Sequence, residues 1–121
     1  MTARMTFLLC LILVAPLTTT EVVSAQIAGG DPKRGKAAVE RYGCAACHAI
    51  PGSANQGSNV GPPLYKIARR AYVGGVLPNT PDSLIRWLRN PPQVDPRTTM
   101  PNLGVSEMDA KDIASYLYTL D

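Results

Sequence analysis

The chain has 121 residues, of which 45% are hydrophobic, 17% charged and 6% aromatic, and its formal net charge is +3. This length fits one small domain rather than two. The basic residues are scattered and are not interleaved with aromatic residues, so the sequence gives no support for nucleic-acid binding.

The N-terminal segment predicts a cleaved secretory signal peptide over residues 1–25. Arg4 precedes an apolar run at residues 7–15, and Val-Ser-Ala at residues 23–25 offers the small residues that a signal peptidase recognises. The run is shorter than the roughly 20 apolar residues that span a membrane, which favours export over an uncleaved anchor. We therefore expect a periplasmic protein without stable membrane insertion.

The expected mature domain, residues 26–121, is short and poor in aromatic residues. Such a chain buries too little apolar area to be comfortably stable alone, and a buried cofactor would supply the missing core. Cys10 lies in the signal, so only Cys44 and Cys47 remain after cleavage. Two cysteines so close together leave none for a wider disulfide framework.

The domain begins with a predicted helix that runs from Pro32 towards Tyr42. Asp31 is placed to cap it, and proline suits the first helical position because no hydrogen-bond donor is lost there. Gly43 is placed to end it. Gly35 inside the helix costs roughly 1 kcal/mol relative to alanine, which indicates that another backbone approaches closely, although simple tolerance is the alternative.

Residues 44–48 read Cys-Ala-Ala-Cys-His, and this spacing predicts a covalent haem attachment site. Two thiols three positions apart lie on one face of a helical turn, where each can add to one vinyl group of the porphyrin. The imidazole of His48 is then carried under the ring, where a neutral nitrogen can bind the iron. The alternative is a disulfide or a thioredoxin-like dithiol with an incidental histidine, which the spacing disfavours.

Two loops and a short helix are expected next. Residues 50–61 are rich in glycine, serine, asparagine and proline, which is typical of a loop. Gly-Pro-Pro-Leu at residues 61–64 opens a short helix with apolar residues at helical spacing up to Ala71, and Arg69 and Arg70 favour its end. A second loop with a Gly-Gly pair follows.

Two longer helices complete the expected domain. Thr80 can cap the first, whose buried stripe includes Trp87 and which the Asn-Pro-Pro at residues 90–92 stops. Residues 93–104 form an extended loop, and Ser106 with Asp109 begins the last helix in the manner of a capping box. No segment shows sustained two-residue alternation, so we predict an all-α domain of about four helices without a sheet.

The second ligand of the iron follows from counting side chains. His48 is the only histidine of the chain, which excludes ligation by two histidines within one molecule. Beyond the signal only Met100 and Met108 offer a thioether. Met108 lies in the first turn of a helix, where methionine more often packs in the core, whereas Met100 lies in a stiff loop before Pro101. We assign Met100 as the ligand, the alternative being a core methionine beside an open iron.

Two axial ligands from the chain predict electron transfer rather than catalysis. A thioether favours ferrous iron and raises the reduction potential, and an iron closed on both faces has no place for peroxide, oxygen or nitrite. The second N–H of His48 needs an acceptor, for which we propose a backbone carbonyl near Pro62. Buried haem propionates need cationic or hydrogen-bonding partners. The side chains available for this role are Arg70, Tyr72, Asn79, Trp87 and Thr98. For each of them the alternative is an ordinary role, as a solvated arginine or a packed aromatic residue.

The chain resembles a class I c-type cytochrome over essentially all of its mature length. The resemblance lies in Gly-Asp-Pro-Lys-Arg-Gly-Lys at residues 30–36, Cys-Ala-Ala-Cys-His, Gly-Pro-Pro-Leu, Asn-Pro, Thr-Thr-Met-Pro at residues 98–101 and Ile-Ala-Ser-Tyr-Leu at residues 113–117. It implies a small all-α fold wrapped around one haem c, held by two thioether bonds. It also implies that the first and last helices cross near Gly35 and Tyr116.

The same resemblance implies roles for residues around the ring. Pro62 gives its carbonyl to the histidine, Arg70 lies near a propionate, Trp87 lies beside the methionine face, and Thr98 lies near the propionate edge. The segment between Arg70 and Thr80 is shorter than in mitochondrial cytochromes c and lacks their separate propionate-binding tryptophan.

Four functions remain to be distinguished. The preferred one is a monohaem carrier of single electrons between periplasmic or membrane-bound redox partners, met transiently. The alternative is a tightly bound cytochrome subunit of a dehydrogenase or oxidase complex. A peroxidase would need an open iron, and a dithiol oxidoreductase without haem would be colourless.

Overall fold

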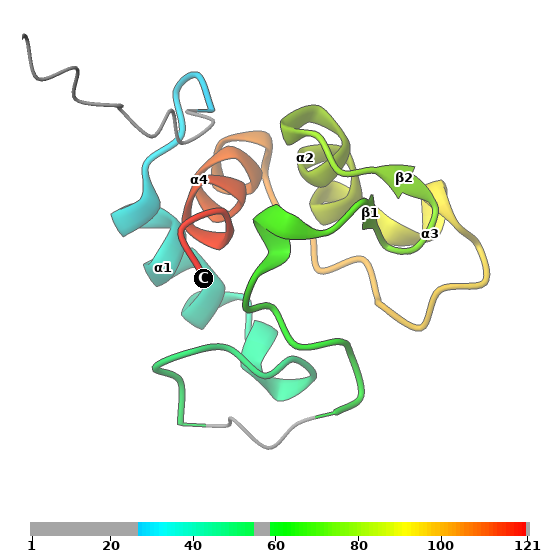
Figure 1. The fold of residues 1–121 in the computed structure, drawn as a ribbon, viewed down its shortest axis with the longest axis horizontal. Coiled ribbons are helices and arrows are strands. Elements are labelled where there is room, and N and C mark those ends of the chain that lie inside the picture. Colours follow the sequence, from blue (N-terminus) through cyan, green and yellow to red (C-terminus); the bar gives the residue numbers. More distant parts are fainter. Residues whose placement is uncertain (1–26, 55–58, 121) are drawn as a thin grey trace, which may run out of the picture.

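The computed structural model describes residues 27–54 and 59–120. Within these residues the chain forms the α-helices α1 Pro32–Arg41, α2 Pro81–Arg89, α3 Pro91–Val94 and α4 Glu107–Leu117, the 3-10 turns η1 Cys44–Ala46 and η2 Ile67–Arg69, and the strands β1 Tyr72–Val73 and β2 Leu77–Pro78 (Figure 1). None of the helices in the described part is both long and apolar enough to cross a membrane. The predicted signal peptide, with Cys10, lies outside the described residues.

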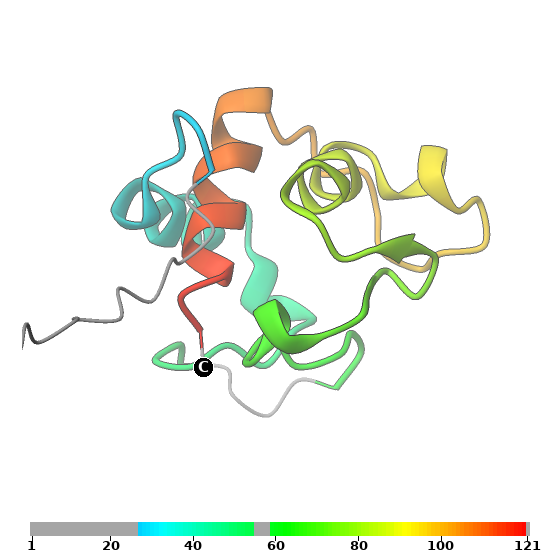
Figure 2. The ribbon, with the colours of Figure 1, turned by 45° about the horizontal axis from the view of Figure 1, so that its top comes forward.

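Helices α1 and α4 pack against each other and cross at Gly35, as the resemblance implied (Figures 1 and 2). A Cβ atom on Gly35 would lie 2.0 Å from the carbonyl oxygen of Asp112 and 2.8 Å from the Cβ of Tyr116. Real Cβ atoms essentially never approach a neighbour within 3.0 Å. The glycine is therefore required by the close contact between the two helices.

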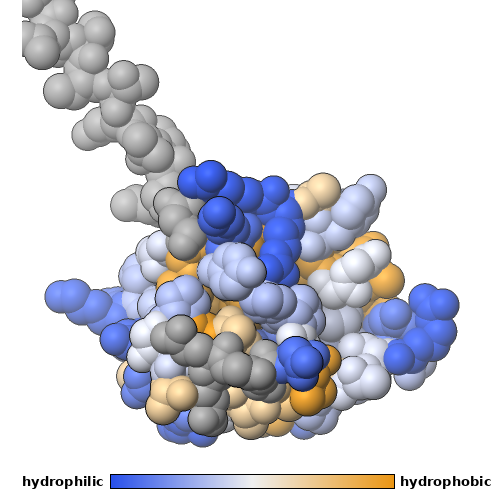
Figure 3. Space-filling model, turned by 60° about the horizontal axis from the view of Figure 1, so that its bottom comes forward, coloured by the Kyte–Doolittle hydropathy of each residue, from blue (hydrophilic) through white to orange (hydrophobic). Residues whose placement is uncertain are grey.

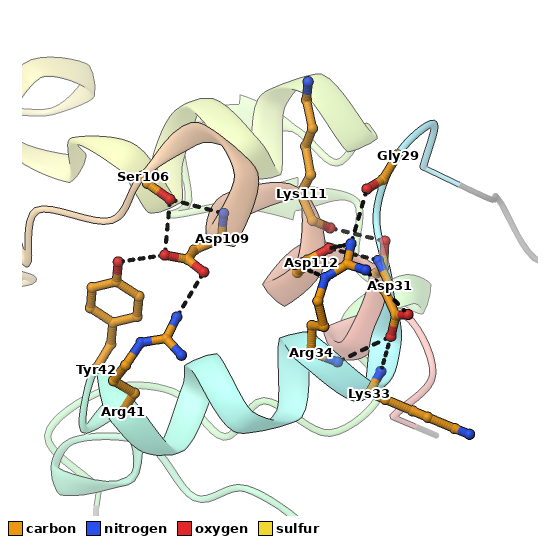
Figure 4. Close-up of polar contacts among 11 residues, drawn as sticks. Gly29, Asp31, Lys33, Arg34, Arg41, Tyr42, Ser106, Asp109, Lys111 and Asp112 are labelled. Atoms are coloured by element: carbon orange, nitrogen blue, oxygen red, sulfur yellow. Dashed lines mark hydrogen bonds and ion pairs between the residues drawn. The ribbon is translucent and has the colours of Figure 1, made fainter.

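An ion pair between the exposed Arg34 and the buried Asp112 joins the same two helices (Figure 4). Asp112 is only 2% exposed and accepts hydrogen bonds from Nε of Arg34 at 2.7 Å, from Nη2 of Arg34 at 2.8 Å, and from the backbone N–H of Asp31 at 2.7 Å. The Arg34 hydrogen bonds are the main cause that lowers the pKa of Asp112. Nothing in the sequence pattern pointed to this charge inside the helix interface.

The helix starts confirm the predicted caps. The side chain of Asp31 accepts the N–H groups of Lys33 at 2.7 Å and Arg34 at 3.0 Å at the start of α1. At α2, Oγ1 of Thr80 accepts the N–H of Ser83 at 3.2 Å. At α4, Oγ of Ser106 accepts the N–H of Asp109 at 3.1 Å. Each cap satisfies a backbone donor that has no partner inside its helix.

The helix predicted after Gly-Pro-Pro-Leu is wrong, because it shortens to the single turn η2. Lys66 has a left-handed φ of 55° just before this turn, and its N–H donates to the carbonyl of Leu120 at 2.7 Å. The N–H of Leu64 donates to the carbonyl of Ala49 at 2.9 Å. Hydrogen bonds to distant segments thus replace the helical ones that the spacing predicted.

Two small elements were not predicted. Residues 91–94 form α3 instead of a loop, because the side chain of Asn90 accepts the N–H of Gln93 at 3.3 Å and proline is compatible with the first helical positions. The expected absence of a sheet is also wrong, since β1 pairs antiparallel with β2. Gly74 and Gly75 turn the chain between the strands with φ values of +59° and +76°. Strands of two residues are too short to show alternation.

The core is formed where α2 meets α4. Leu84 and Trp87 of α2 belong to the same buried cluster as Ile113 and Leu117 of α4. Figure 2 shows α1 and α4 on one side, α2 and α3 on the other, and the segment that contains η1 and η2 along the lower edge. Contrary to the expectation for a methionine in the first turn of a helix, Met108 does not pack in this core, because it is 57% exposed.

Candidate functional site

A cavity of about 500 Å³ lies between the two halves of the domain. Its walls come from the end of α1, η1, the segment 60–74, α2, the segment 98–103 and α4. This volume is in the range of cofactor and ligand sites. The structure brings to its walls these site residues that the sequence singled out: Cys44, Cys47, His48, Pro62, Arg70, Trp87, Thr98 and Met100.

The two cysteines are presented to the cavity by η1. Gly43, with a left-handed φ of 67°, turns the chain out of α1 and into this segment. The carbonyl of Cys44 accepts the N–H groups of Cys47 at 3.2 Å and of His48 at 3.0 Å, which holds the three residues in one tight turn. Both cysteines are free thiols, and burial raises the pKa of Cys44.

One nitrogen of His48 is already committed to a backbone carbonyl. Nδ1 lies 2.7 Å from the carbonyl oxygen of Pro62, the residue proposed for this role. Because a carbonyl oxygen only accepts, Nδ1 must carry the proton and donate it. In the neutral imidazole Nε2 then carries no proton, and an unprotonated ring nitrogen is the atom that can bind a metal.

Gly61 fixes the position of the His48 ring, a role that the sequence did not suggest. A Cβ at residue 61 would lie 2.4 Å from Cε1 and 2.6 Å from Nδ1 of the imidazole. The N–H of Gly61 also donates to the carbonyl of Cys47 at 2.8 Å. The signal was present in Gly-Pro-Pro-Leu, but a glycine before two prolines predicts a turn without indicating what packs on it.

Met100 lines the same cavity as His48 and is half-buried against the core. Its N–H donates to Oγ1 of Thr98 at 3.1 Å, and the N–H of Thr98 donates to the carbonyl of Asp95 at 3.0 Å. Hydrogen bonds of the loop thus hold the backbone of the methionine. Met108, the other candidate ligand, is not among the residues that line the cavity.

The hairpin packs on Trp87 at another wall of the cavity. Trp87 is 8% exposed, and a Cβ on Gly74 would lie 2.5 Å from Cζ3 of its indole. Tyr72 and Val73 of β1 line the cavity beside it. The hairpin, which the sequence did not predict, therefore helps to shape the site.

Of the proposed propionate partners, Asn79 is not placed for that role. It is not among the residues that line the cavity, and its Nδ2 donates to the carbonyls of Ile67 at 2.7 Å and Arg70 at 2.9 Å. Its Oδ1 accepts the hydroxyl of Tyr118 at 2.9 Å. Arg70 does line the cavity, and its Nη2 donates to the backbone carbonyls of Pro63 and Tyr65.

A polar cluster holds Tyr42, which also lines the cavity (Figure 4). The hydroxyl of Tyr42 donates to Oδ2 of Asp109 at 2.8 Å, and Nη2 of Arg41 lies 2.7 Å from Oδ1 of the same carboxylate. The guanidinium of Arg41 also lies 5.3 Å from the centre of the Tyr42 ring. The Tyr42 hydrogen bond is the main cause that lowers the pKa of Asp109.

The residues around the cavity fit a haem attached to the chain. The two free thiols have the spacing that attachment needs. Nδ1 of His48 is hydrogen-bonded to Pro62, which leaves Nε2 for the iron, and the thioether of Met100 lines the same cavity. The remaining described walls are mostly aliphatic and aromatic, and Arg70 is the lining side chain that is cationic at neutral pH. A guanidinium is suited to a buried carboxylate.

Comparison with known proteins gives two findings. Residues 32–121 match the family model described as cytochrome c. The chain is also similar to cytochrome c oxidase subunit 2 of Alkalihalophilus pseudofirmus, with 30% identity over 88 residues, which is 72% of this chain and 25% of the relative. The similarity therefore spans a quarter of that oxidase subunit's length.

Proposed function

Because the chain belongs to the cytochrome c family, whose members bind haem c covalently and transfer electrons, we propose that it is a monohaem carrier with His48 and Met100 as iron ligands. When bound, haem iron alternates between the ferric and ferrous states and so holds one electron at a time. The observation that supports this proposal most is the single cavity that His48, Met100 and both cysteines share.

The residues that would attach the ring and those that would support the iron ligands have distinct roles in this proposal. Cys44 and Cys47 hold the ring through thioether bonds. Pro62 fixes the orientation of His48 through its carbonyl, 2.7 Å from Nδ1. Thr98 holds the backbone of Met100. A neutral, soft thioether stabilises the ferrous state and raises the potential above that of a haem with two histidines.

The walls of the cavity would keep water and small molecules from the ring. Trp87, Leu84 and Leu88 from α2 and Ile113 and Leu117 from α4 present apolar surface to it. With His48 and Met100 both holding the iron, no coordination position would be left for a substrate. This arrangement supports electron transfer over a peroxidase-like reaction. We expect Arg70 and Thr98, which line the cavity, to meet the propionates, and Trp87 to lie beside the methionine face of the ring.

A stable place in a larger complex is the second candidate function. It is supported by the similarity to cytochrome c oxidase subunit 2. We prefer a free carrier exported to the periplasm, which meets donor and acceptor transiently. Gel filtration of the native protein from its source distinguishes the two, because a complex subunit would elute with its partner proteins.

The proposal is tested on protein produced with a haem-attachment system. We expect one haem per chain by mass, a low-spin spectrum, and no rapid binding of carbon monoxide to the ferrous form. Met100→Ala should keep the attached haem, lose the low-spin signature and lower the potential. Met108→Ala, which changes an exposed methionine away from the cavity, should match the wild type. An unchanged Met100→Ala spectrum would refute the assignment.

A further inference from the structure

A second cleft, of about 720 Å³, lies between α2, α3 and the start of α4. None of the described residues lines both this cleft and the cavity proposed for the haem, so the cleft can be described without reference to the haem. Helix α2 separates the two, because Ile85 and Arg89 line the cleft whereas Trp87, on the opposite face of the helix, lines the cavity. The volume of the cleft is sufficient for a small organic molecule.

The charged side chains that line the cleft leave one positive charge in excess. The cationic ones are Arg86, Arg89 and Lys111, and the anionic ones are Asp82 and Glu107. Two of the cations share Glu107, whose carboxylate lies 3.1 Å from Nζ of Lys111 and 3.7 Å from Nη1 of Arg89. Within the described part of the chain the exposed guanidinium of Arg86 has no ion pair or hydrogen bond. Its charge is therefore available to a ligand.

Two asparagine side chains add hydrogen-bond donors to the cleft. Oδ1 of Asn90 accepts the N–H of Gln93 at 3.3 Å, and Oδ1 of Asn102 accepts the N–H of Gly104 at 2.9 Å. Each amide thus uses its oxygen on the backbone, and among the described residues neither Nδ2 group has a partner. Both side chains therefore present mainly donors to the cleft that they line.

The cleft also has an apolar lining, which comes from the half-buried Ile85 and the buried Val105. A guanidinium, amide donors and aliphatic side chains around one space are suited to an anionic group carried on an apolar body. The face shown in Figure 3, which carries residues 47–54 and 59–64, instead presents apolar and weakly polar residues around these segments.

We propose that this cleft binds a small organic monocarboxylate with an aliphatic body, a function separate from electron transfer. The carboxylate pairs with Arg86, whose guanidinium can donate two parallel hydrogen bonds to it, and the asparagine amides donate to the same group. The aliphatic part lies on Ile85 and Val105. One negative charge balances the excess positive charge of the lining, whereas a dianion such as a phosphate monoester would leave a negative charge in excess.

The test titrates hexanoate into ¹⁵N-labelled, haem-loaded protein and follows the backbone amide shifts by NMR. We expect saturable binding with a Kd of about 1 mM or below, which is within reach of a ligand of this size. The largest shifts should lie at residues 82–93 and 102–107. Acetate, which lacks the aliphatic chain, should bind at least about tenfold more weakly, because each buried CH₂ group improves binding about fourfold. Hexanol, which lacks the charge, should also bind at least about tenfold more weakly.

Arg86→Gln removes the positive charge at an exposed position and should weaken hexanoate binding at least about tenfold. Lys36→Gln is the matched control, because Lys36 is exposed on α1, does not line the cleft and loses the same charge. This variant should bind hexanoate like the wild type. Unchanged binding in Arg86→Gln, acetate binding as tight as that of hexanoate, or shifts confined to residues outside the cleft would overturn the proposal. Tighter binding of hexyl phosphate than of hexanoate would overturn the choice of a monoanion.

Discussion

Substitution of Gly35 by alanine tests the contact that fixes α1 on α4. The new Cβ would lie 2.0 Å from the carbonyl oxygen and 2.6 Å from the carbonyl carbon of Asp112. Ordinary contact begins at 3.4 Å, so the helices must separate by about 1.4 Å to reach it. Backbone atoms form this obstacle, and they cannot move aside as the end of a flexible side chain can.

The expected magnitude follows from two opposing effects. Overpacking of a well-packed contact costs about 1–3 kcal/mol, and a clash with backbone belongs at the upper end. Alanine is the better helix former by about 1 kcal/mol. The net loss of stability should be about 2 kcal/mol, which for a domain of this size lowers Tm by about 8–16 °C.

The assay is thermal and urea unfolding of the haem-loaded protein, followed by far-UV circular dichroism. Lys36→Ala is the control, because Lys36 is exposed on the same helix, and it should change stability by no more than about 0.5 kcal/mol. α1 leads directly through Gly43 into η1, so the haem absorbance should also be perturbed in Gly35→Ala. A variant as stable as the wild type would refute the close-contact interpretation.

Three further substitutions test the ion pair and the packing around His48. Asp112→Asn should destabilise the domain by about 2 kcal/mol at neutral pH, because the negative charge opposite Arg34 is lost and the new amide NH2 cannot accept the hydrogen bond from Nε of Arg34. The pKa of Asp112 is lowered on folding, so its contribution to the free energy of unfolding is present above the ordinary pKa and is lost as pH falls below about 4. Urea unfolding at several pH values should therefore show the stabilities of wild type and variant converging at low pH. A difference that stays constant with pH would contradict this sign. Gly61→Ala should displace His48 and so change the haem spectrum and the reduction potential. Pro62→Ala keeps the carbonyl that accepts from His48 and should change both properties less. A larger effect of Pro62→Ala than of Gly61→Ala would contradict the packing role of the glycine.

The sequence predicted most of the site because its chemistry is local. Cys44, Cys47 and His48 lie within one turn, and a lone histidine together with one loop methionine narrowed the iron ligands to His48 and Met100. That both line one cavity depends on long-range packing, which the structure provides. Caps at Asp31, Thr80 and Ser106 were predictable for the same reason, since each acts within three residues.

Features that depend on distant partners could not be predicted. Leu64, Ile67 and Ala71 have helical spacing, yet Lys66 leaves the helical conformation and bonds to Leu120, which lies beyond the end of α4. Asp112 lies on a helix face where a charge is unexpected, and its partners, Arg34 and the backbone N–H of Asp31, come from the other end of the chain. Gly61 and Gly74 resemble ordinary turn residues until the rings of His48 and Trp87 are seen against them.

The iron K-edge X-ray absorption spectrum of the haem-loaded protein tests the central claim most directly. The account predicts one sulfur and five nitrogen scatterers around the iron in the wild type, with the sulfur lost in Met100→Ala and retained in Met108→Ala. A first shell without sulfur in the wild type, or sulfur that persists in Met100→Ala, would contradict ligation by Met100 and with it the closed electron carrier.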